Sequence, residues 1–234
     1  MVARPAQRAQ PRPPLTRDRV LRAAIQVADE HGIAALTMRR LAEVVGAEAM
    51  SLYHHVANKE QVLDGVVEMI TAEINEQVDA IDLPSAGTAW KAAMRQRILT
   101  ARRVFLRHPW APQVFESRSV LNAAVLKYHD GLVRIMRDGG FSNDLCHHAL
   151  HALGSRALGF TQELFNPGGA AAGADTGADL SSMAAALPNL VGMLAEVVHD
   201  DPDSTLGWCD DQTEFEFGLD LLLDGLDRLR AQGS

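Results

Sequence analysis

A short segment at residues 49–60, AMSLYHHVANKE, combines polar and aromatic side chains at helical spacing. Leu52 and Val56 lie four residues apart, which places both on one face of a short helix that packs inward. The opposite face carries a serine, a tyrosine and two histidines. Hydroxyl and imidazole groups donate and accept hydrogen bonds, so this surface suits a flat polar partner, a groove or a catalytic pocket.

A second group of side chains that could take part in chemistry consists of Cys146, His147 and His151. The two histidines have the i, i+4 spacing of zinc ligands on a helix, but no third ligand motif lies nearby. The chain also lacks H-E-x-x-H, G-x-S-x-G and a glycine-rich nucleotide loop. We therefore expect no enzyme activity, no cofactor and no metal. A helical metal-dependent enzyme or metal sensor that uses His147 and His151 is the alternative.

Charge is distributed unevenly along the 234 residues, whose net charge is -8. Residues 1–60 contain nine Lys/Arg and six Asp/Glu, whereas the remainder contains 13 and 24. An acidic total therefore does not exclude nucleic acid as a partner of the basic segment. The proline-rich start, residues 1–14, is expected to be a disordered basic arm. Without an apolar run of membrane length, and with two distant cysteines, the chain is expected to be cytoplasmic.

Helix signals follow one another through the first third of the chain. A helix is predicted to begin after the N-cap Thr16 and to end at Gly32, and a second to run from Thr37 to Gly46. Both glycines stand where the backbone must take a positive φ. A longer helix over residues 58–81 is predicted to connect this part to the rest.

The remainder, residues 82–234, also has helical periodicity, and neither alternating apolar runs nor a hairpin signal appear. The fold is therefore predicted to be all-α. The low-complexity stretch NPGGAAAGADTGAD predicts a flexible loop at residues 166–180. It lacks the Lys-Ser/Thr pair of a phosphate-binding loop.

Two short helices joined by a turn at Gly46, the second about seven residues long, have the helix-turn-helix arrangement. The run LTMRRLAEVVGAEAMSLYHHVANKEQVLDGV, which begins at Leu36, closely resembles the DNA-binding domain of the tetracycline-repressor (TetR) family. Tyr53, His55 and Lys59 fall on the hallmark of that family. The resemblance implies a three-helix DNA-binding domain at residues 15–60. A helical-bundle domain for effector binding and dimerisation then follows.

The resemblance also implies which residues meet DNA. Thr37 and Lys59 would hold phosphates at helix N-termini, and Ser51 would donate or accept a hydrogen bond at a base edge. Glu48 departs from the Ser/Thr cap that is common in the family. Packing for Tyr53, a structural role for His55 and simple solvation for Arg39 remain alternatives. The predicted DNA-binding set is Thr37, Arg39, Ala49, Met50, Ser51, Tyr53, His54, His55 and Lys59.

The last helix contains a heptad seam of apolar residues at spacings of 4, 3, 4 and 3. We expect this seam to form a homodimer, although an intrachain core would explain it too. Two glycines seven residues apart would let two helices approach closely. The predicted interface is Phe215, Gly218, Leu219, Leu222, Gly225, Leu226 and Leu229.

The resemblance further implies a small-molecule effector, held in a cavity among the central helices. The predicted pocket residues are Trp90, Met94, Phe105, His108, Phe115, Tyr128, His129, His147 and His151. The function expected from all of these features is that of a ligand-responsive transcriptional regulator. It would repress from a palindromic double-stranded operator until the effector releases it, without a membrane partner.

Overall fold

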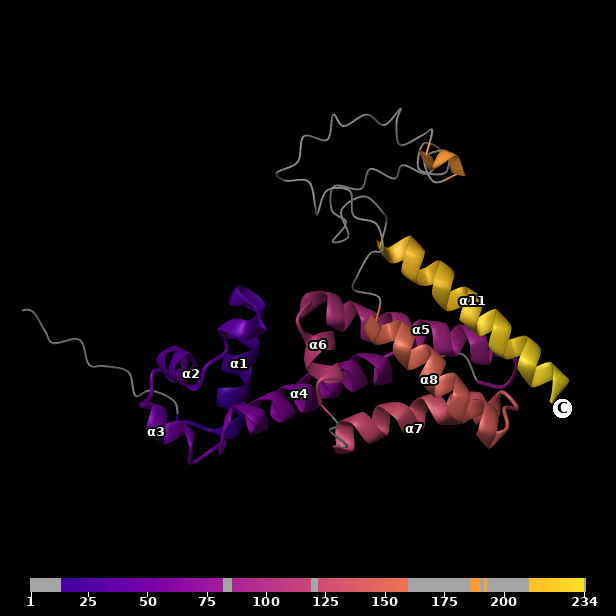
Figure 1. Ribbon diagram of the computed structural model, residues 1–234. Coiled ribbons are helices and arrows are strands. Elements are labelled where there is room, and N and C mark those ends of the chain that lie inside the picture. Colours follow the sequence, from indigo (N-terminus) through magenta and orange to yellow (C-terminus); the bar gives the residue numbers. More distant parts are fainter. Residues whose placement is uncertain are drawn as a thin grey trace, which may run out of the picture. The chain divides into compact units, whose positions relative to one another are not determined.

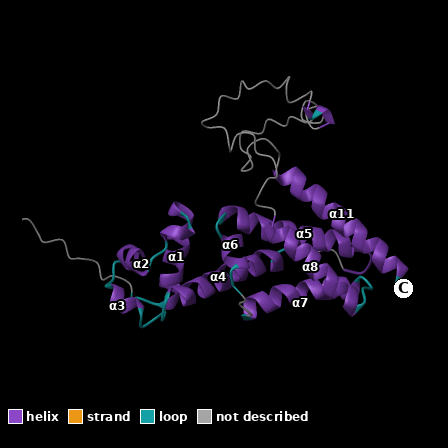
Figure 2. Cartoon of the chain, in the orientation of Figure 1, coloured by secondary structure: helices purple, strands orange, loops and turns teal. Residues whose placement is uncertain are grey.

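The computed structural model describes most of the chain, and its secondary structure is helical (Figure 1). Throughout these residues every regular element is a helix, which confirms the predicted all-α class (Figure 2). The predicted basic arm, apart from Pro14, and the predicted loop at 166–180 lie outside the described residues. The structure describes residues 14–81, 86–118, 122–159, 186–189, 192 and 211–233.

Ten elements have defined bounds. The first five are α1 (Arg17–His31), the 3-10 helix η1 (Ile33–Ala35), α2 (Met38–Val45), α3 (Ala49–Leu52) and α4 (Lys59–Asp79). The other five are α5 (Ala86–Arg107), α6 (Ala111–Glu116), α7 (Ala123–Asp138), α8 (Asn143–Gly159) and α11 (Asp211–Gln232).

The chain divides into two compact units. Unit 1 consists of Met1–Asp79 and Arg103–Tyr128, and unit 2 consists of Ala80–Arg102 and His129–Ser234. The end of α5, α6 and the start of α7 group with unit 1, and the domain boundary at residue 82 stays a prediction. Contacts between segments far apart in sequence account for this grouping. The helical periodicity of the sequence does not indicate such contacts.

Unit 1 is built on a close approach of α1 and α4. A Cβ atom at Gly65 would lie 2.7 Å from both terminal methyl groups of Leu21, so a larger residue there would force the buried Leu21 side chain to move. Leu41 and Leu52 are fully buried beside them and dock α2 and α3. Burial of these side chains supplies the hydrophobic stabilisation of the unit.

Unit 2 is held together by aromatic packing and by ion pairs between α5 and α11. Trp90 of α5 is buried edge-to-face against Phe141, with ring centroids 4.6 Å apart. Arg95 of α5 binds Asp220 at 2.7 Å and Glu216 at 2.5 Å, both on α11. These half-exposed pairs contribute less than the buried rings, because water screens their charges.

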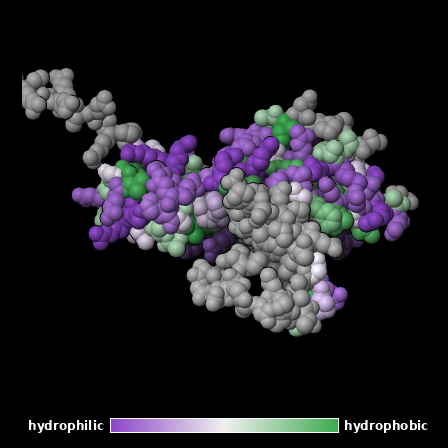
Figure 3. All heavy atoms as spheres, turned by 90° about the horizontal axis from the view of Figure 1, so that it is seen from above, coloured by the Kyte–Doolittle hydropathy of each residue, from purple (hydrophilic) through white to green (hydrophobic). Residues whose placement is uncertain are grey.

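Hydrophilic residues dominate the face shown in Figure 3, with smaller hydrophobic areas between them. Across the described residues we find no helix with the length and apolar character that a bilayer crossing requires.

Candidate nucleic-acid interface

The turn between α2 and α3 has the geometry that the sequence predicts. Gly46 adopts a left-handed conformation, with φ 66° and ψ 38°, and its N–H donates to carbonyl oxygens of the last turn of α2. The N–H of Ala47 donates to the carbonyl of Ala42 at 3.0 Å, which closes the helix end. A residue with a Cβ atom would be strained at Gly46, so the turn depends on glycine.

Helix α3 is shorter than expected. It spans Ala49–Leu52, four residues, and the chain then turns with the His55 and Val56 N–H groups both donating to the carbonyl of Leu52. Val56 is buried, and Asn58 caps the next helix, so the backbone must leave the helical path at this point. Residues expected on the second half of a recognition helix therefore lie in a turn.

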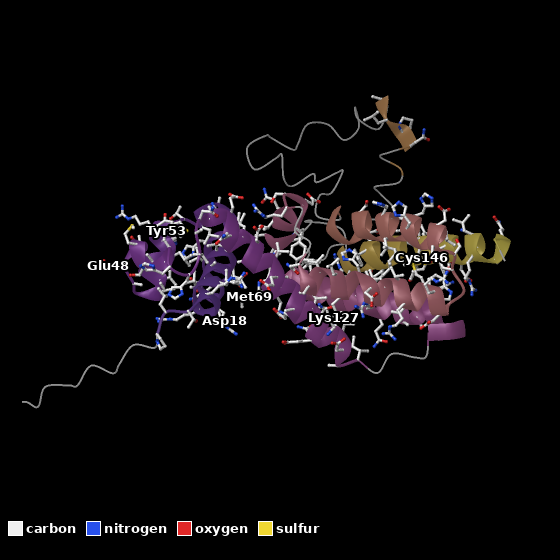
Figure 4. All side chains as sticks on the ribbon, turned by 90° about the horizontal axis from the view of Figure 1, so that it is seen from below. Asp18, Glu48, Tyr53, Met69, Lys127 and Cys146 are labelled. Atoms are coloured by element: carbon white, nitrogen blue, oxygen red, sulfur yellow. The ribbon has the colours of Figure 1, made fainter. Side chains whose placement is uncertain are left out.

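Burial separates the two faces of α3. Leu52 is completely buried, while Met50 is 71% exposed and Tyr53 is 45% exposed. Ala49 and His54 are also exposed, and Ser51 is half-buried. Figure 4 shows Glu48 and Tyr53 at one end of unit 1. The structure thus brings the predicted base-reading residues together on one solvent-facing surface.

Two of the predicted DNA-binding residues, Thr37 and Lys59, lie at helix N-termini. The Thr37 hydroxyl oxygen accepts a hydrogen bond from the Arg40 N–H at 3.1 Å, as an N-cap does. Lys59 is the first residue of α4, and Asn58 before it accepts from the Gln61 N–H at 2.8 Å. These caps confirm the predicted starts of both helices. Each N-terminus favours an anion through its dipole and its N–H groups.

Arg39 and Glu48 add opposite charges to this face. The Arg39 guanidinium is 91% exposed and pairs with Glu43 one turn later, at 3.2 Å. Glu48 occupies the N-cap position of α3 with an extended backbone, but its carboxylate caps none of the described N–H groups of that helix. A phosphate that approaches Arg39 must therefore compete with Glu43.

Arg118, at the end of α6, is a positioning residue that the sequence analysis missed. Its side chain is largely buried, donates to Asp64 at 2.5 Å and also binds Glu60, both on the first turns of α4. The hydrogen bonds that Arg118 donates to Glu60 and Asp64 raise its pKa above the usual value. Because more than fifty residues separate the partners, no local spacing in the sequence could have revealed this clamp.

His108, predicted to line an effector pocket, contacts acidic residues of two helices in unit 1, and its role in a pocket stays a prediction. Its Nδ1 atom lies 2.7 Å from the Asp29 carboxylate of α1, and Trp110 donates to the same oxygen at 2.7 Å. Nε2 of His108 lies 3.7 Å from Glu73 of α4. The imidazole therefore joins three helices of unit 1.

The other predicted pocket residues are divided between the two units. In unit 1, Phe105 and Phe115 pack edge-to-face at 5.2 Å, and Tyr128 is half-buried. In unit 2, Trp90 and Met94 are fully buried, and Trp90 donates to Asp227 at 3.2 Å. The assignment of these residues to one pocket stays a prediction.

The predicted histidine pair lies on the exposed side of α8. The rings of His147 and His151 are 4.7 Å apart, and both side chains are exposed, as is His129 on α7. Within the part of the chain that the structure describes, no three His, Cys, Asp or Glu side chains form a group that could hold a metal ion. Cys146, which directly precedes His147, is buried, and that burial raises the pKa of its thiol.

An apolar groove of about 260 Å³ lies between α8 and α11 in unit 2. Four of the seven predicted interface residues, Leu222, Gly225, Leu226 and Leu229, line it together with Leu145, His148, Ala152 and Leu221. Phe215 and Leu219, also in the predicted interface, are buried inside this chain and face its own core, as does most of Leu226. Gly218 is half-buried. The apolar seam of α11 is thus shared between the core and an open groove.

Models of known protein families match both the N-terminal and the C-terminal part of the chain. The family described as bacterial regulatory proteins, tetR family, matches residues 20–66. The tetracyclin repressor-like C-terminal domain matches residues 83–230. The HTH-type transcriptional repressor DrrR1 of Streptomyces coeruleorubidus is 31% identical over 228 residues, which cover 95% of this chain and 81% of that protein. The tetracycline repressor protein class D of Escherichia coli is 37% identical over 94 residues, 40% of this chain and 41% of that protein.

Solved structures agree with the sequence relatives. The Streptomyces coelicolor TetR family protein ActR in complex with actinorhodin has a TM-score of 0.71 and is 28% identical, covering 93% of this chain and 99% of that chain. A possible TetR family regulator from Streptomyces coelicolor A3(2) also has a TM-score of 0.71 and is 28% identical, covering 91% of this chain and 99% of that chain.

The fold and the exposed α3 surface are those of the helix-turn-helix class of transcriptional regulators. The chain belongs to the TetR family, and it is a ligand-responsive DNA-binding transcriptional repressor. Members of this family are regulators and are generally not enzymes.

Proposed function

We propose that two copies of this chain bind a palindromic operator and that a small-molecule effector releases them. The observation that supports this proposal is the solvent-facing side of α3, which is docked from behind by the buried Leu52. A major groove about 12 Å wide admits such an element. One copy reads too few bases to be selective, whereas two copies read half-sites about 34 to 36 Å apart.

The phosphate contacts are assigned to groups beside helix N-termini. Thr37 uses its hydroxyl oxygen for the cap of α2, so its hydroxyl hydrogen is available to a phosphate. Lys59 places an ammonium group at the start of α4, and the exposed Tyr53 adds a phenol. Arg39 contributes once a phosphate displaces Glu43. The exposed His54 and the half-buried His55 are assigned to the same DNA-contacting surface.

Base reading is assigned to the start of α3. Ser51 is the hydrogen-bonding group there, and Ala49 and Met50 make apolar contacts. Phosphate contacts fix the register of the protein on the duplex, while these three residues carry the sequence information. The repressor acts on chromosomal operators, which places it in the cytoplasm.

The dimer is assigned to the groove of unit 2. Leu221 and Leu229 of α11 are exposed at its edge, and Phe217 is exposed on the same helix. A second copy that lays its α8 and α11 on this groove would remove these side chains from water. The small residues Gly225 and Ala152 in the lining allow helices to approach closely.

The effector is proposed to be small and largely apolar. The central helices α5 and α7 supply unit 2 with buried apolar side chains such as Met94 and Ile135. ActR, which has a TM-score of 0.71 with this chain, has been solved with actinorhodin. A tenfold loss of operator affinity requires only about 1.4 kcal/mol of differential effector binding.

The proposal is tested by selecting duplexes from a random library and measuring their affinity for variants. Tyr53→Ala and Lys59→Ala are expected to weaken binding of the selected duplex about tenfold each, because a phosphate contact is lost. Arg134→Ala removes an exposed cation of α7 and is the matched control, with affinity unchanged. Unchanged affinity in both α3–α4 variants, or selection of no duplex at all, would refute the proposal.

A further inference from the structure

Met50 stands out among the residues that face solvent. It is the most exposed of the large hydrophobic side chains in the described residues, at 71%. Leu52 on the inner face of α3 is completely buried, so the exposure of Met50 does not come from a loosely packed helix. An apolar side chain exposed to water at this position contributes a favourable free energy of binding when a partner covers it.

Given the proposed function, the partner that covers Met50 is the floor of the major groove. Residues 49–52, AMSL, include no Arg, Lys, Asn or Gln, the side chains that read guanine and adenine through paired hydrogen bonds. A thioether offers no hydrogen-bond donor and only a weak acceptor. The apolar group that base pairs present in the major groove is the C5-methyl group of thymine.

We infer that Met50 is a specificity-determining residue that reads the C5-methyl group of one pyrimidine in each half-site. Thymine carries this methyl group, uracil and cytosine lack it, and 5-methylcytosine has it at the same ring position. The inference rests on the proposed function and adds the chemical group that Met50 recognises. At that one position the repressor distinguishes methylated from unmethylated pyrimidines, whichever base carries the methyl group.

The geometry favours Met50 over its neighbours for this role. Ala49 is exposed but short, and the Ser51 side chain is half-buried and polar. Tyr53 lies in the turn after α3 and ends in a phenol suited to phosphate. The Met50 side chain has three rotatable bonds and a polarisable sulfur, so it adapts its shape to a methyl group.

The test begins with a duplex selected by the wild-type protein from a random library. Each thymine of the selected half-site is then replaced by uracil, in both half-sites at once, and affinity is measured by fluorescence anisotropy. One symmetric pair is expected to weaken binding about fourfold per half-site, roughly 15-fold in all, as burial of one methyl group predicts. At that pair, 5-methylcytosine·guanine is expected to bind more tightly than cytosine·guanine.

Variants separate the methyl contact from other effects. Met50→Ala is expected to bind thymine and uracil duplexes equally, whereas Met50→Leu restores most of the discrimination. Ser51→Ala is the control and keeps the preference for thymine. Because Met50 is exposed, these variants are expected to fold normally.

The inference is overturned if every thymine-to-uracil change is neutral in the wild type, or if Met50→Ala discriminates as the wild type does. In both cases a duplex is bound, so the proposed function survives. Selection of no duplex would overturn both.

Discussion

The Asp29 carboxylate of α1 lies 2.7 Å from Nδ1 of His108, although 79 residues separate them in the chain. Trp110 donates to the same carboxylate oxygen, also at 2.7 Å. One acidic group of the first helix thus holds the junction between α5 and α6. Both rings are largely buried, so water cannot readily replace the carboxylate as the hydrogen-bond acceptor of their N–H groups.

Replacement of Asp29 by alanine is expected to destabilise unit 1. The indole N–H and the imidazole would each lose an acceptor, and a buried unsatisfied group costs about 1–3 kcal/mol. Urea unfolding followed by circular dichroism measures the loss. Glu30→Ala is the control, because Glu30 is an exposed neighbour on the same helix. A free energy of unfolding equal in the two variants would contradict the role of Asp29.

Replacement of Glu43 by glutamine is expected to tighten DNA binding. The change frees Arg39 from its carboxylate partner at 3.2 Å and removes a negative charge from the face proposed to meet phosphate. Exposed ion pairs are worth about 0.2–1 kcal/mol, so a gain of about 1.4- to fivefold is expected at low salt. Affinity measured across a salt series should also show a steeper dependence. Glu30→Gln, which also removes an exposed charge, should leave both values unchanged.

Charge placed in the groove between α8 and α11 is expected to prevent dimer formation. Leu229→Glu puts a carboxylate on a leucine that is 52% exposed in the single chain, so the fold tolerates it. Burial of that carboxylate against a second copy would be costly. Sedimentation velocity should show a monomer for this variant and a dimer for Leu106→Glu, which alters an exposed leucine of α5. A dimeric Leu229→Glu protein would place the interface elsewhere.

Stability is expected to fall in acid partly through Asp227. Burial raises the pKa of this carboxyl, but hydrogen bonds from Trp90 and Arg230 outweigh burial and set it below the ordinary value of 3.8. A carboxyl with a depressed folded-state pKa contributes stability above its unfolded value and loses that contribution as pH falls through the folded value. Urea midpoints of Asp227→Asn and wild type should therefore differ at neutral pH and converge below about pH 3.8. A difference that stays unchanged well below pH 3.8 would argue against this role.

Local interactions made much of the N-terminal part predictable. Thr16 accepts from the Arg19 N–H at 3.2 Å, and Asn58 accepts from the Gln61 N–H at 2.8 Å, as their positions before helical runs indicate. Gly46 takes the predicted positive φ. Each of these features depends on residues within one helical turn, so each is visible in the sequence.

Long-range contacts were not predictable in this way. Nothing in the spacing of Arg118, Glu60 and Asp64 indicates that they meet. Nor does the sequence indicate that His108 contacts Asp29, which lies 79 residues away in a different helix. Side chains far apart in sequence become neighbours only when helices pack, and many packings satisfy the same periodicity.

The run Leu221, Leu222, Leu223 shows where the two kinds of information divide. The sequence alone determined that α11 is an amphipathic helix, because its leucines recur at helical spacing among charged residues. Successive side chains point about 100° apart around a helix, so three leucines in a row leave the inward direction undecided. Only packing in the tertiary structure decided it: Leu223 is fully buried, whereas Leu221 is 56% exposed at the edge of the groove.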